Sequence, residues 1–451
     1  MKIRVFDGGK GDCILLTGSN GEHVLVDGGL VDTFGHDSYS ANVAPFLAKL
    51  RDNDERLRLV CVSHVDQDHI GGILRMLDDE YEWRVYDYLE SQGAEPDTPE
   101  NARPPKIDEI WHNAFHEQVT ENRGELQQVH NQLMAALTLL APAASAAVAA
   151  SASPAPFHGN ELLSDLATSM REAAQLSRRI SDQQLDINRN RFFPDGLVAY
   201  HDGVAPRRRG SLRVSVLGPT MGQLTELRQK WNKWLESAKG IRQIESIRRA
   251  ADRDESQLTG GDLGGFLQNN LGPAIGDRET VSDENVASII LYVREGQHNI
   301  LLTGDARDDH VYEALDNKGL TRADGSAHIN VIKVPHHASK NNFSTDFARL
   351  VTADHYLICG NGGHGNPHLE VLQRLVESRL GRPEQRGTHP EVANRFKIWF
   401  SADEGSLDAY PDHMRDVEEL MASLSDRMDP NNQMTVRFNR NRSMLVNPNP
   451  L

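Results

Sequence analysis

The chain has 451 residues, 38% of them hydrophobic, and its formal net charge at pH 7 is −17. This length is enough for two or three average domains, or for one domain that carries a large insertion. The acidic excess argues against a protein that binds nucleic acid over its whole surface, because phosphate contacts need lysine and arginine, but it does not exclude a local site.

The first 80 residues show the pattern of short strands joined by turns and crossover helices. Strands are predicted at 2–6, 13–16, 23–26 and 57–62, where β-prone residues are bounded by Gly and Asn turns. Helices are expected at about 41–51 and 70–77. Strands that alternate with helices in this way indicate an α/β fold.

From about residue 90 to 280 the sequence becomes mostly helical. A short strand is expected at 107–111 and another at 212–217, and the second is a candidate member of the core. The predicted helices and the Ala/Ser/Pro-rich linker between the first two cover 121–140, 141–156, 159–184 and 221–254. We interpret this block as an insertion that could form a lid, a dimerisation arm or a docking surface for a protein partner.

Strand character then returns, so one interrupted domain explains the pattern better than a string of independent domains. Strands are predicted at 287–293, 300–303, 330–334 and 356–359, and helices at 308–318 and 367–379. The resulting division is a first half of the fold, an insertion, a second half and a C-terminal extension, at 1–90, 91–280, 281–400 and 401–451. In the extension we expect a helix within 403–427 and a late strand pair within 434–446.

The cysteines and the lengths of the apolar runs indicate the cellular compartment. Cys13, Cys61 and Cys359 all lie in strand-like apolar segments, which favours buried free thiols in a reducing compartment over disulfides. No apolar run approaches the ~20 residues that span a bilayer, and the N-terminus lacks the apolar segment of a signal peptide. The sequence therefore predicts a cytoplasmic protein without a membrane partner.

The most informative segment is the loop that follows the predicted strand at 57–62. It carries His64, Asp66, Asp68 and His69 within six positions, followed by Gly71-Gly72. Loops at strand ends are where a rigid scaffold usually presents reactive groups. Because imidazoles and carboxylates at this density need a cation between them, and mixed nitrogen and oxygen ligands suit Zn²⁺ or Mn²⁺, we predict a metal site.

Three further polar clusters follow predicted strands. Asp305 follows the apolar run 300–303, where a helix N-cap is an equally good interpretation. The pair His336-His337 follows Pro335, and a paired histidine after a strand favours a metal ligand. The loop 361–368 contains three glycines and ends in His368, and glycines allow a backbone to approach a ligand closely.

Together these motifs resemble the metallo-β-lactamase-fold hydrolases. The pattern His-x-Asp-x-Asp-His-x-Gly-Gly, then Leu-Thr-Gly-Asp, then Lys-Val-Pro-His-His is similar to the branch that contains the nuclease-like domain of the DNA-uptake protein ComEC. The turn Asp7–Asp12, the pair Asn285 and Ser288, and Gly365-x-Pro367-His368 fit the same branch, with Gly8, Lys10 and Asn366 as departures. The resemblance covers roughly 1–80 and 282–380 and implies an αββα sandwich with a large helical insertion.

The resemblance also implies a set of ligands for two divalent cations, Zn²⁺ or Mn²⁺. His64 and Asp66 would bind the first metal, Asp68 and His69 the second, and Asp305 would bridge both. His336 would complete the second site, while His337 would face the substrate or support a ligand. The remaining ligand of the first metal is open, with His112, His116 and His158 as candidates. Asp27 is expected to hold a ligand histidine.

The function that the resemblance favours is a metal-dependent phosphodiesterase or nuclease that acts on nucleic acid or another phosphodiester. Residues expected to act on the substrate are Asp68, His337, Lys340 and His368. The alternatives are a hydrolase of a small ester, lactone or phosphodiester, which the acidic charge favours, and a non-catalytic scaffold, which the intact ligand set argues against. Similarity to metallo-hydrolase effectors also suggests a role in bacterial anti-phage defence.

Overall fold

The computed structural model describes residues 1–31, 38–113, 172, 175–193, 196–237, 287–392, 395–426 and 433–448. The expected helix at 121–140, the linker, most of the helix at 159–184, Asn285, and the candidate ligands His116 and His158 lie outside these ranges. Among the residues described, no helix has the length and apolar character needed to cross a membrane.

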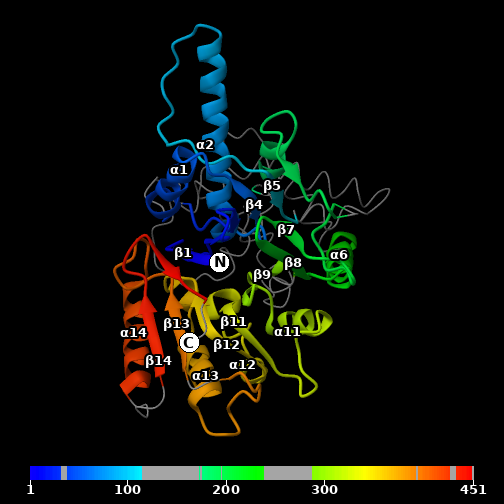
Figure 1. Ribbon diagram of the computed structural model, residues 1–451, viewed down its shortest axis with the longest axis vertical. Coiled ribbons are helices and arrows are strands. Elements are labelled where there is room, and N and C mark those ends of the chain that lie inside the picture. Colours follow the sequence, from blue (N-terminus) through cyan, green and yellow to red (C-terminus); the bar gives the residue numbers. More distant parts are fainter. Residues whose placement is uncertain are drawn as a thin grey trace.

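Two mixed β-sheets lie at the centre of the protein (Figure 1). The first has the strand order β15-β1-β2-β3-β4-β5-β6, and the second has the order β14-β13-β12-β11-β10-β9-β8-β7. The first sheet consists of β1 Lys2–Phe6, β2 Ile14–Thr17, β3 His23–Val26, β4 Leu57–Cys61, β5 Glu109–Trp111, β6 Asn188–Arg189 and β15 Ser443–Val446. The second consists of β7 Arg207–Arg209, β8 Leu212–Gly218, β9 Ile290–Glu295, β10 His298–Leu302, β11 Ala327–Lys333, β12 Val351–Ile358, β13 Arg395–Phe400 and β14 Gln433–Phe438.

Residues on both faces of the central strands are buried, as in β3, where all four are, so each sheet has two apolar faces. The inner faces share one core in which Val5 and Leu16 of the first sheet belong to the same cluster as Leu291 and Val331 of the second. Helices α1 (Ala44–Asp52) and α2 (Gln67–Ser91) cover the outer face of the first sheet. The outer face of the second is covered by α11 Asp308–Asn317, α12 Thr345–Leu350, α13 Leu369–Leu380 and α14 Pro411–Asp426. This αββα layering confirms the predicted fold class.

Parallel pairing brings several strand ends to one edge of the sandwich. Strands β3 to β6 are parallel in the first sheet, and β10 to β14 are parallel in the second. The two sheets meet at this edge, where the backbone N–H of Ile289 donates to the carbonyl of Ser63 at 2.8 Å. The loops that follow β4, β10 and β11 therefore face one another, although they are far apart in sequence.

Two segments join the sheets from outside the two halves of the fold. Strand β8, from the block interpreted as an insertion, pairs antiparallel with β9 and is part of the second sheet, and α6 (Met221–Glu236) follows it. The late strands β14 and β15 are confirmed as strands, but they do not pair with each other. Strand β14 extends the second sheet beside β13, and β15 extends the first sheet beside β1, so the C-terminal segment ties both sheets together.

Helix α2 continues well past the predicted end at residue 77. The buried apolar residues of the helix end at Leu77, because its far part extends away from the rest of the protein, as Figure 1 shows. Two ion pairs at i,i+4 spacing stabilise the helix around and beyond the end of its core contacts. They join Arg75 with Asp79 and Arg84 with Glu80. The periodic spacing of apolar residues therefore predicted only the buried part of the helix.

Candidate metal centre

The loop between β4 and α2 carries the first group of predicted ligands. Asp66 is the residue before the helix, so Asp68 and His69 lie in its first turn. Glycines allow the close packing that fixes this turn. A Cβ on Gly72 would lie 2.1 Å from the carbonyl oxygen of Gly28, and one on Gly11 would lie 1.7 Å from that of Asp68. The start of α2 is therefore held directly against the turns that follow β1 and β3.

The second group comes from the ends of β10 and β11. Gly304, at φ 50°, turns the chain so that Asp305 points into the space between the sheets. Its backbone N–H donates to Ser288 Oγ at 3.2 Å. After β11, three consecutive non-glycine residues have positive φ: His336 at 46°, His337 at 52° and Ala338 at 63°. Side chains rarely adopt this left-handed conformation, and such strain is concentrated at functional sites.

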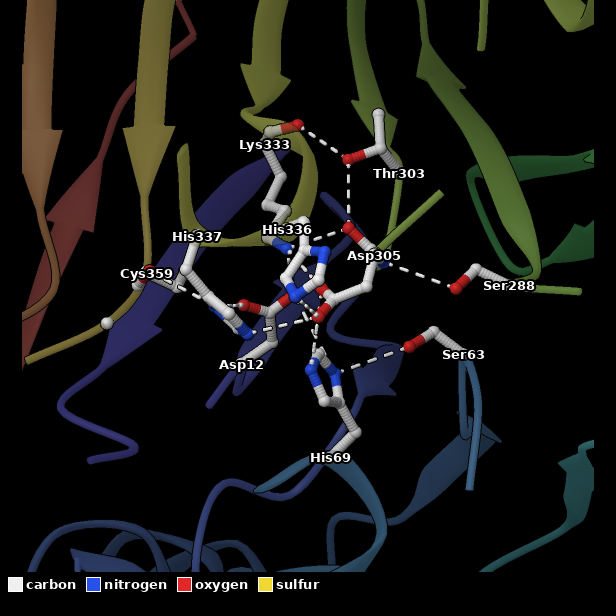
Figure 2. Close-up of polar contacts among 12 residues, drawn as sticks. Asp12, Ser63, His69, Ser288, Thr303, Asp305, Lys333, His336, His337 and Cys359 are labelled. Atoms are coloured by element: carbon white, nitrogen blue, oxygen red, sulfur yellow. Dashed lines mark hydrogen bonds and ion pairs between the residues drawn. The ribbon is translucent and has the colours of Figure 1, made fainter. Parts of the chain in front are cut away.

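Asp305 lies at the point where the two groups meet (Figure 2). Its Oδ2 atom is 3.9 Å from His64 Nε2, 3.6 Å from His336 Nε2 and 3.2 Å from His337 Nε2. Its Oδ1 atom is 3.5 Å from His69 Nε2. The structure thus brings four predicted histidines around one carboxylate.

Asp66 and Asp68 flank this arrangement. Asp66 Oδ2 is 3.3 Å from His64 Nε2, and Asp68 Oδ2 is 3.5 Å from His337 Nε2. Two sets of side chains have ligand atoms that lie within 4.8 Å of one another, and these are His64, His69 and Asp305, and Asp12, His69 and His337. His69 belongs to both sets, so two neighbouring cation positions could share it or divide the carboxylates between them.

The hydrogen bonds of the histidines fit metal ligands. The Nδ1 atom of His69 lies 3.0 Å from Asp27 Oδ2, that of His336 lies 2.9 Å from Asn342 Oδ1, and that of His337 lies 3.2 Å from the carbonyl of Cys359. Each ring can donate through Nδ1 and present the lone pair of Nε2 to the centre. The predicted contact of Asp27 with a histidine is confirmed.

Three of the Nε2 atoms also lack a hydrogen bond of their own. His64, His69 and His337 each have a buried Nε2 without a hydrogen-bond partner among the described residues. Buried nitrogen atoms are rarely left unsatisfied in proteins, and a metal ion is one of the groups that can use such a lone pair. The residues present therefore fit a divalent metal centre.

Two charged residues at the centre, Lys333 and Asp12, were not assigned a role from the sequence. The side chain of Lys333 is 1% exposed, and its Nζ lies 2.6 Å from Asp12 Oδ2 and 3.2 Å from Asp305 Oδ1. Burial by itself would lower the pKa of Lys333, but these two carboxylates hold it above its usual range. The ammonium therefore stays charged at neutral pH and fixes both carboxylates. A lysine in the apolar run Val331–Val334 was the available signal.

The carboxylates and imidazoles of the centre also shift one another's pKa values. Burial alone would raise the pKa of Asp12, yet Lys333 and the neighbouring histidines hold it below its usual range. Burial alone would lower the pKa values of His69 and His337, yet nearby carboxylates, led by Asp305, raise both well above the usual value. The centre thus has an excess of negative charge that protons relieve and that divalent cations would relieve in their place.

A family comparison agrees with this geometry. The family model of the metallo-beta-lactamase superfamily matches residues 6–82. The match contains the His64–His69 loop and the Asp12 and Asp27 turns, and this superfamily is mostly metal-dependent hydrolases. No curated protein matches the chain. The ComEC-type branch stays a prediction.

The remaining predicted site residues lie around the centre at different depths. His112 is fully buried directly after β5, at the same sheet edge as His64, but it belongs to neither set of converging ligands. The backbone N–H of His368 donates to the carbonyl of Ala338 at 3.1 Å, which places it beside the strained turn. Lys340 is exposed at the end of that turn.

Proposed function

We propose that the protein is a metal-dependent phosphodiesterase whose centre holds two divalent cations. The observation that supports this most directly is the set of three buried Nε2 atoms around the Asp305 carboxylate, which find no hydrogen bond of good geometry among the described residues. Mixed imidazole and carboxylate ligation suits Zn²⁺ or Mn²⁺, and such cations bind phosphate oxygens. His64, Asp66, Asp68, His69, Asp305 and His336 keep their predicted roles as ligands, and His337 joins them because it faces both Asp68 and Asp305.

The chain's own residues would prepare the centre for hydrolysis. When bound, two divalent cations lower the pKa of water and neutralise charge that develops on a phosphate oxygen. Asp27 fixes the ring of His69, and Lys333 keeps one oxygen of Asp305 engaged so that the other can face the cations. His336, whose side chain is 28% exposed, lies on the more open side of the centre. His368 and Lys340 are the nearby groups that could bind a phosphate or protonate a leaving group.

The test is hydrolysis of bis-p-nitrophenyl phosphate, DNA and RNA with Mn²⁺ or Zn²⁺, combined with a metal count per chain. Asp305→Asn removes the central carboxylate charge, so we expect activity to fall at least about 10³-fold and bound metal to fall below two ions per chain. Asp309→Asn, on the exposed first turn of α11, is the matched control and should change neither.

Other outcomes would favour the alternatives. Cleavage of small esters or lactones, with no cleavage of phosphodiesters, would favour a small-molecule hydrolase, which the net charge of −17 makes the second candidate. Bound metal without any hydrolysis would favour a scaffold. For the proposed role in anti-phage defence, we expect the protein to reduce plaque formation and Asp305→Asn to abolish that effect.

A further inference from the structure

An arginine-rich surface lies where both sheets end, on the flank formed by β6 and β7. The ion pair between Arg209 of β7 and Glu109 of β5, the strand beside β6, joins the two sheets here, and Figure 1 shows β5 and β7 side by side. Besides Arg209, whose charge Glu109 balances, the surface carries residues that we call the arginine flank: Arg191, Phe192, Arg207, Arg208, Arg213 and Arg294. This concentration of cations is notable in a chain with a net charge of −17.

Three of these arginines lie directly opposite one another on neighbouring strands. Arg208 of β7 pairs in register with Arg213 of β8, and Arg213 pairs with Arg294 of β9. All three side chains are exposed, and none forms an ion pair with a carboxylate within the described ranges. Like charges at directly opposite positions destabilise a sheet, so a row of this kind costs stability unless an anion lies across it.

An exposed aromatic ring lies on the other face of β7 from the row. Arg207 points to the inner face of the second sheet, because its partner Val214 belongs to the core between the sheets, and the neighbouring Arg208 therefore points to the outer face. Phe192 is 41% exposed, and the guanidinium carbons of Arg207 and Arg191 lie 4.8 and 5.9 Å from the centre of its ring. An aromatic face next to guanidinium groups is the combination with which proteins bind single-stranded nucleic acids, because bases stack on the ring while cations contact the phosphates. Double-stranded nucleic acid offers no free base face to such a ring.

Part of the flank lies just after β6, at the sheet edge that carries the metal centre. The side chain of Asn190 accepts from the backbone N–H of His112 at 3.1 Å and donates to the carbonyl of His112 at 2.6 Å. Because β5 and β6 are parallel, Arg191 and Phe192 emerge at the same edge as the ligand loops. On the other sheet, the arginine row lies toward the far ends of β8 and β9. Arg294 is six residues along the chain from Ser288, which contacts Asp305, and this is a separation of roughly 20 Å in an extended chain.

We propose that the arginine flank binds single-stranded nucleic acid and directs it to the metal centre. The inference rests on the proposed phosphodiesterase function and names its substrate class. Arg191 and Arg207 would contact phosphates while Phe192 stacks on a base. The arginine row would contact further phosphates where the strand passes around the edge of β7 to the outer face of the second sheet. The acidic surface elsewhere would repel the same polyanion, which confines binding to this side of the protein.

The test measures binding of a fluorescein-labelled 20-nucleotide oligothymidine to the full chain by fluorescence anisotropy, in EDTA, between 50 and 200 mM salt. The variant Arg207→Gln/Arg208→Gln/Arg213→Gln should weaken binding about tenfold or more and reduce the salt slope by about 2. The matched control, Arg349→Gln/Arg382→Gln/Arg415→Gln, makes the same change in net charge at exposed sites away from the flank and should bind as wild type does. Phe192→Ala should weaken binding and leave the salt slope unchanged.

Three results would overturn the proposal: equal binding by the flank and control variants, equally tight binding of a 20-base-pair duplex, and aggregation of the flank variant with its binding unchanged. The last would mean that the arginines only protect the β7 edge from pairing with other chains. Since binding is measured without metal, the two proposals can fail separately. Binding without hydrolysis of any substrate would refute only the phosphodiesterase, and hydrolysis of bis-p-nitrophenyl phosphate without oligonucleotide binding would refute only the flank.

Discussion

The metal centre has an N-terminal half and a C-terminal half, and the chain places their side chains in different ways. The N-terminal half takes His64, Asp66, Asp68 and His69 from one loop and the first turn of α2. The C-terminal half takes Asp305, Lys333, His336 and His337 from the ends of two strands and from a turn with left-handed residues. The first arrangement needs correct local geometry, whereas the second needs the whole second sheet to be paired in register.

The halves also differ in how their charges are compensated. In the N-terminal half, a buried carboxylate, Asp27, contacts the ligand histidine. In the C-terminal half, a buried ammonium, Lys333, contacts the carboxylates. His336 contacts the neutral side chain of Asn342, and His337 contacts the Cys359 carbonyl and Asp12. Substitutions in the N-terminal half should therefore mainly reduce metal affinity, and substitutions in the C-terminal half should mainly reduce the stability of the metal-free protein.

The largest expected effect is that of Lys333→Met, which removes the buried ammonium. Asp12 and Asp305 would then be buried without it, and breaking a buried pair in this way costs about 3–5 kcal/mol of unfolding free energy. Urea unfolding at pH 7 in EDTA measures the loss, with the exposed Lys106→Met as the control. A loss below about 1 kcal/mol would show that Lys333 does not support the C-terminal half.

The next effect concerns the contact between Asp27 and His69. Asp27→Asn keeps the shape but removes the carboxylate that accepts from Nδ1, and such changes reduce metal affinity about 10–100-fold. Asn342→Ala removes the neutral partner of His336 in the other half, and we expect a smaller loss of affinity. Competition with a chromogenic chelator measures both. If the two variants lose the same affinity, the two halves do not differ in the way described.

The sequence was most informative where the site is local. The loop 64–69 could be recognised because its ligands follow one another along the chain, and Asp305 and His336-His337 could be recognised because each follows an apolar strand. Asp12 and Lys333 were quoted within motifs but given no role, since only the pairing of β10 with β11 and the packing of the Gly11 turn on Asp68 bring them together. The α/β class followed from the alternation of strands and helices, and the αββα sandwich followed from the family resemblance. The strands within 433–446 join different sheets, and no local sequence pattern indicates this.

The C-terminal half also differs in backbone conformation, because its turn after β11 has three consecutive left-handed residues. Ala338 is buried at φ 63°, a conformation that a β-branched residue adopts only with strain. We expect Ala338→Val to cost about 2 kcal/mol of unfolding free energy. Ala338→Gly, which adopts this φ freely, is the control and should stay within about 1 kcal/mol of wild type. Equal stability of the two variants would mean that the turn relaxes without strain.

The smallest effect is the pH dependence of metal binding, which should also distinguish individual histidines. The pKa values of His69 and His337 are raised in the metal-free protein, chiefly by Asp305 against the effect of burial. The stability that these protonated rings contribute is therefore fully present below about pH 6.5 and is lost as the pH rises through their folded pKa values. A cation must displace the same protons, so metal affinity should fall as the pH falls, by about tenfold per pH unit for each proton released.

Proton release at pH 7 can be counted by calorimetry in buffers that differ in ionisation enthalpy. The pKa of His336 is lowered by its burial, so this ring is already neutral, and His336→Ala should leave the number of released protons unchanged. His337→Ala should reduce that number by about one, because its ring is protonated before metal binds. The neighbouring histidines of one turn would then differ in charge, since His337 faces Asp12, Asp68 and Asp305 together, whereas His336 lies near Asp305 on the more open side. An equal change in both variants would contradict this assignment.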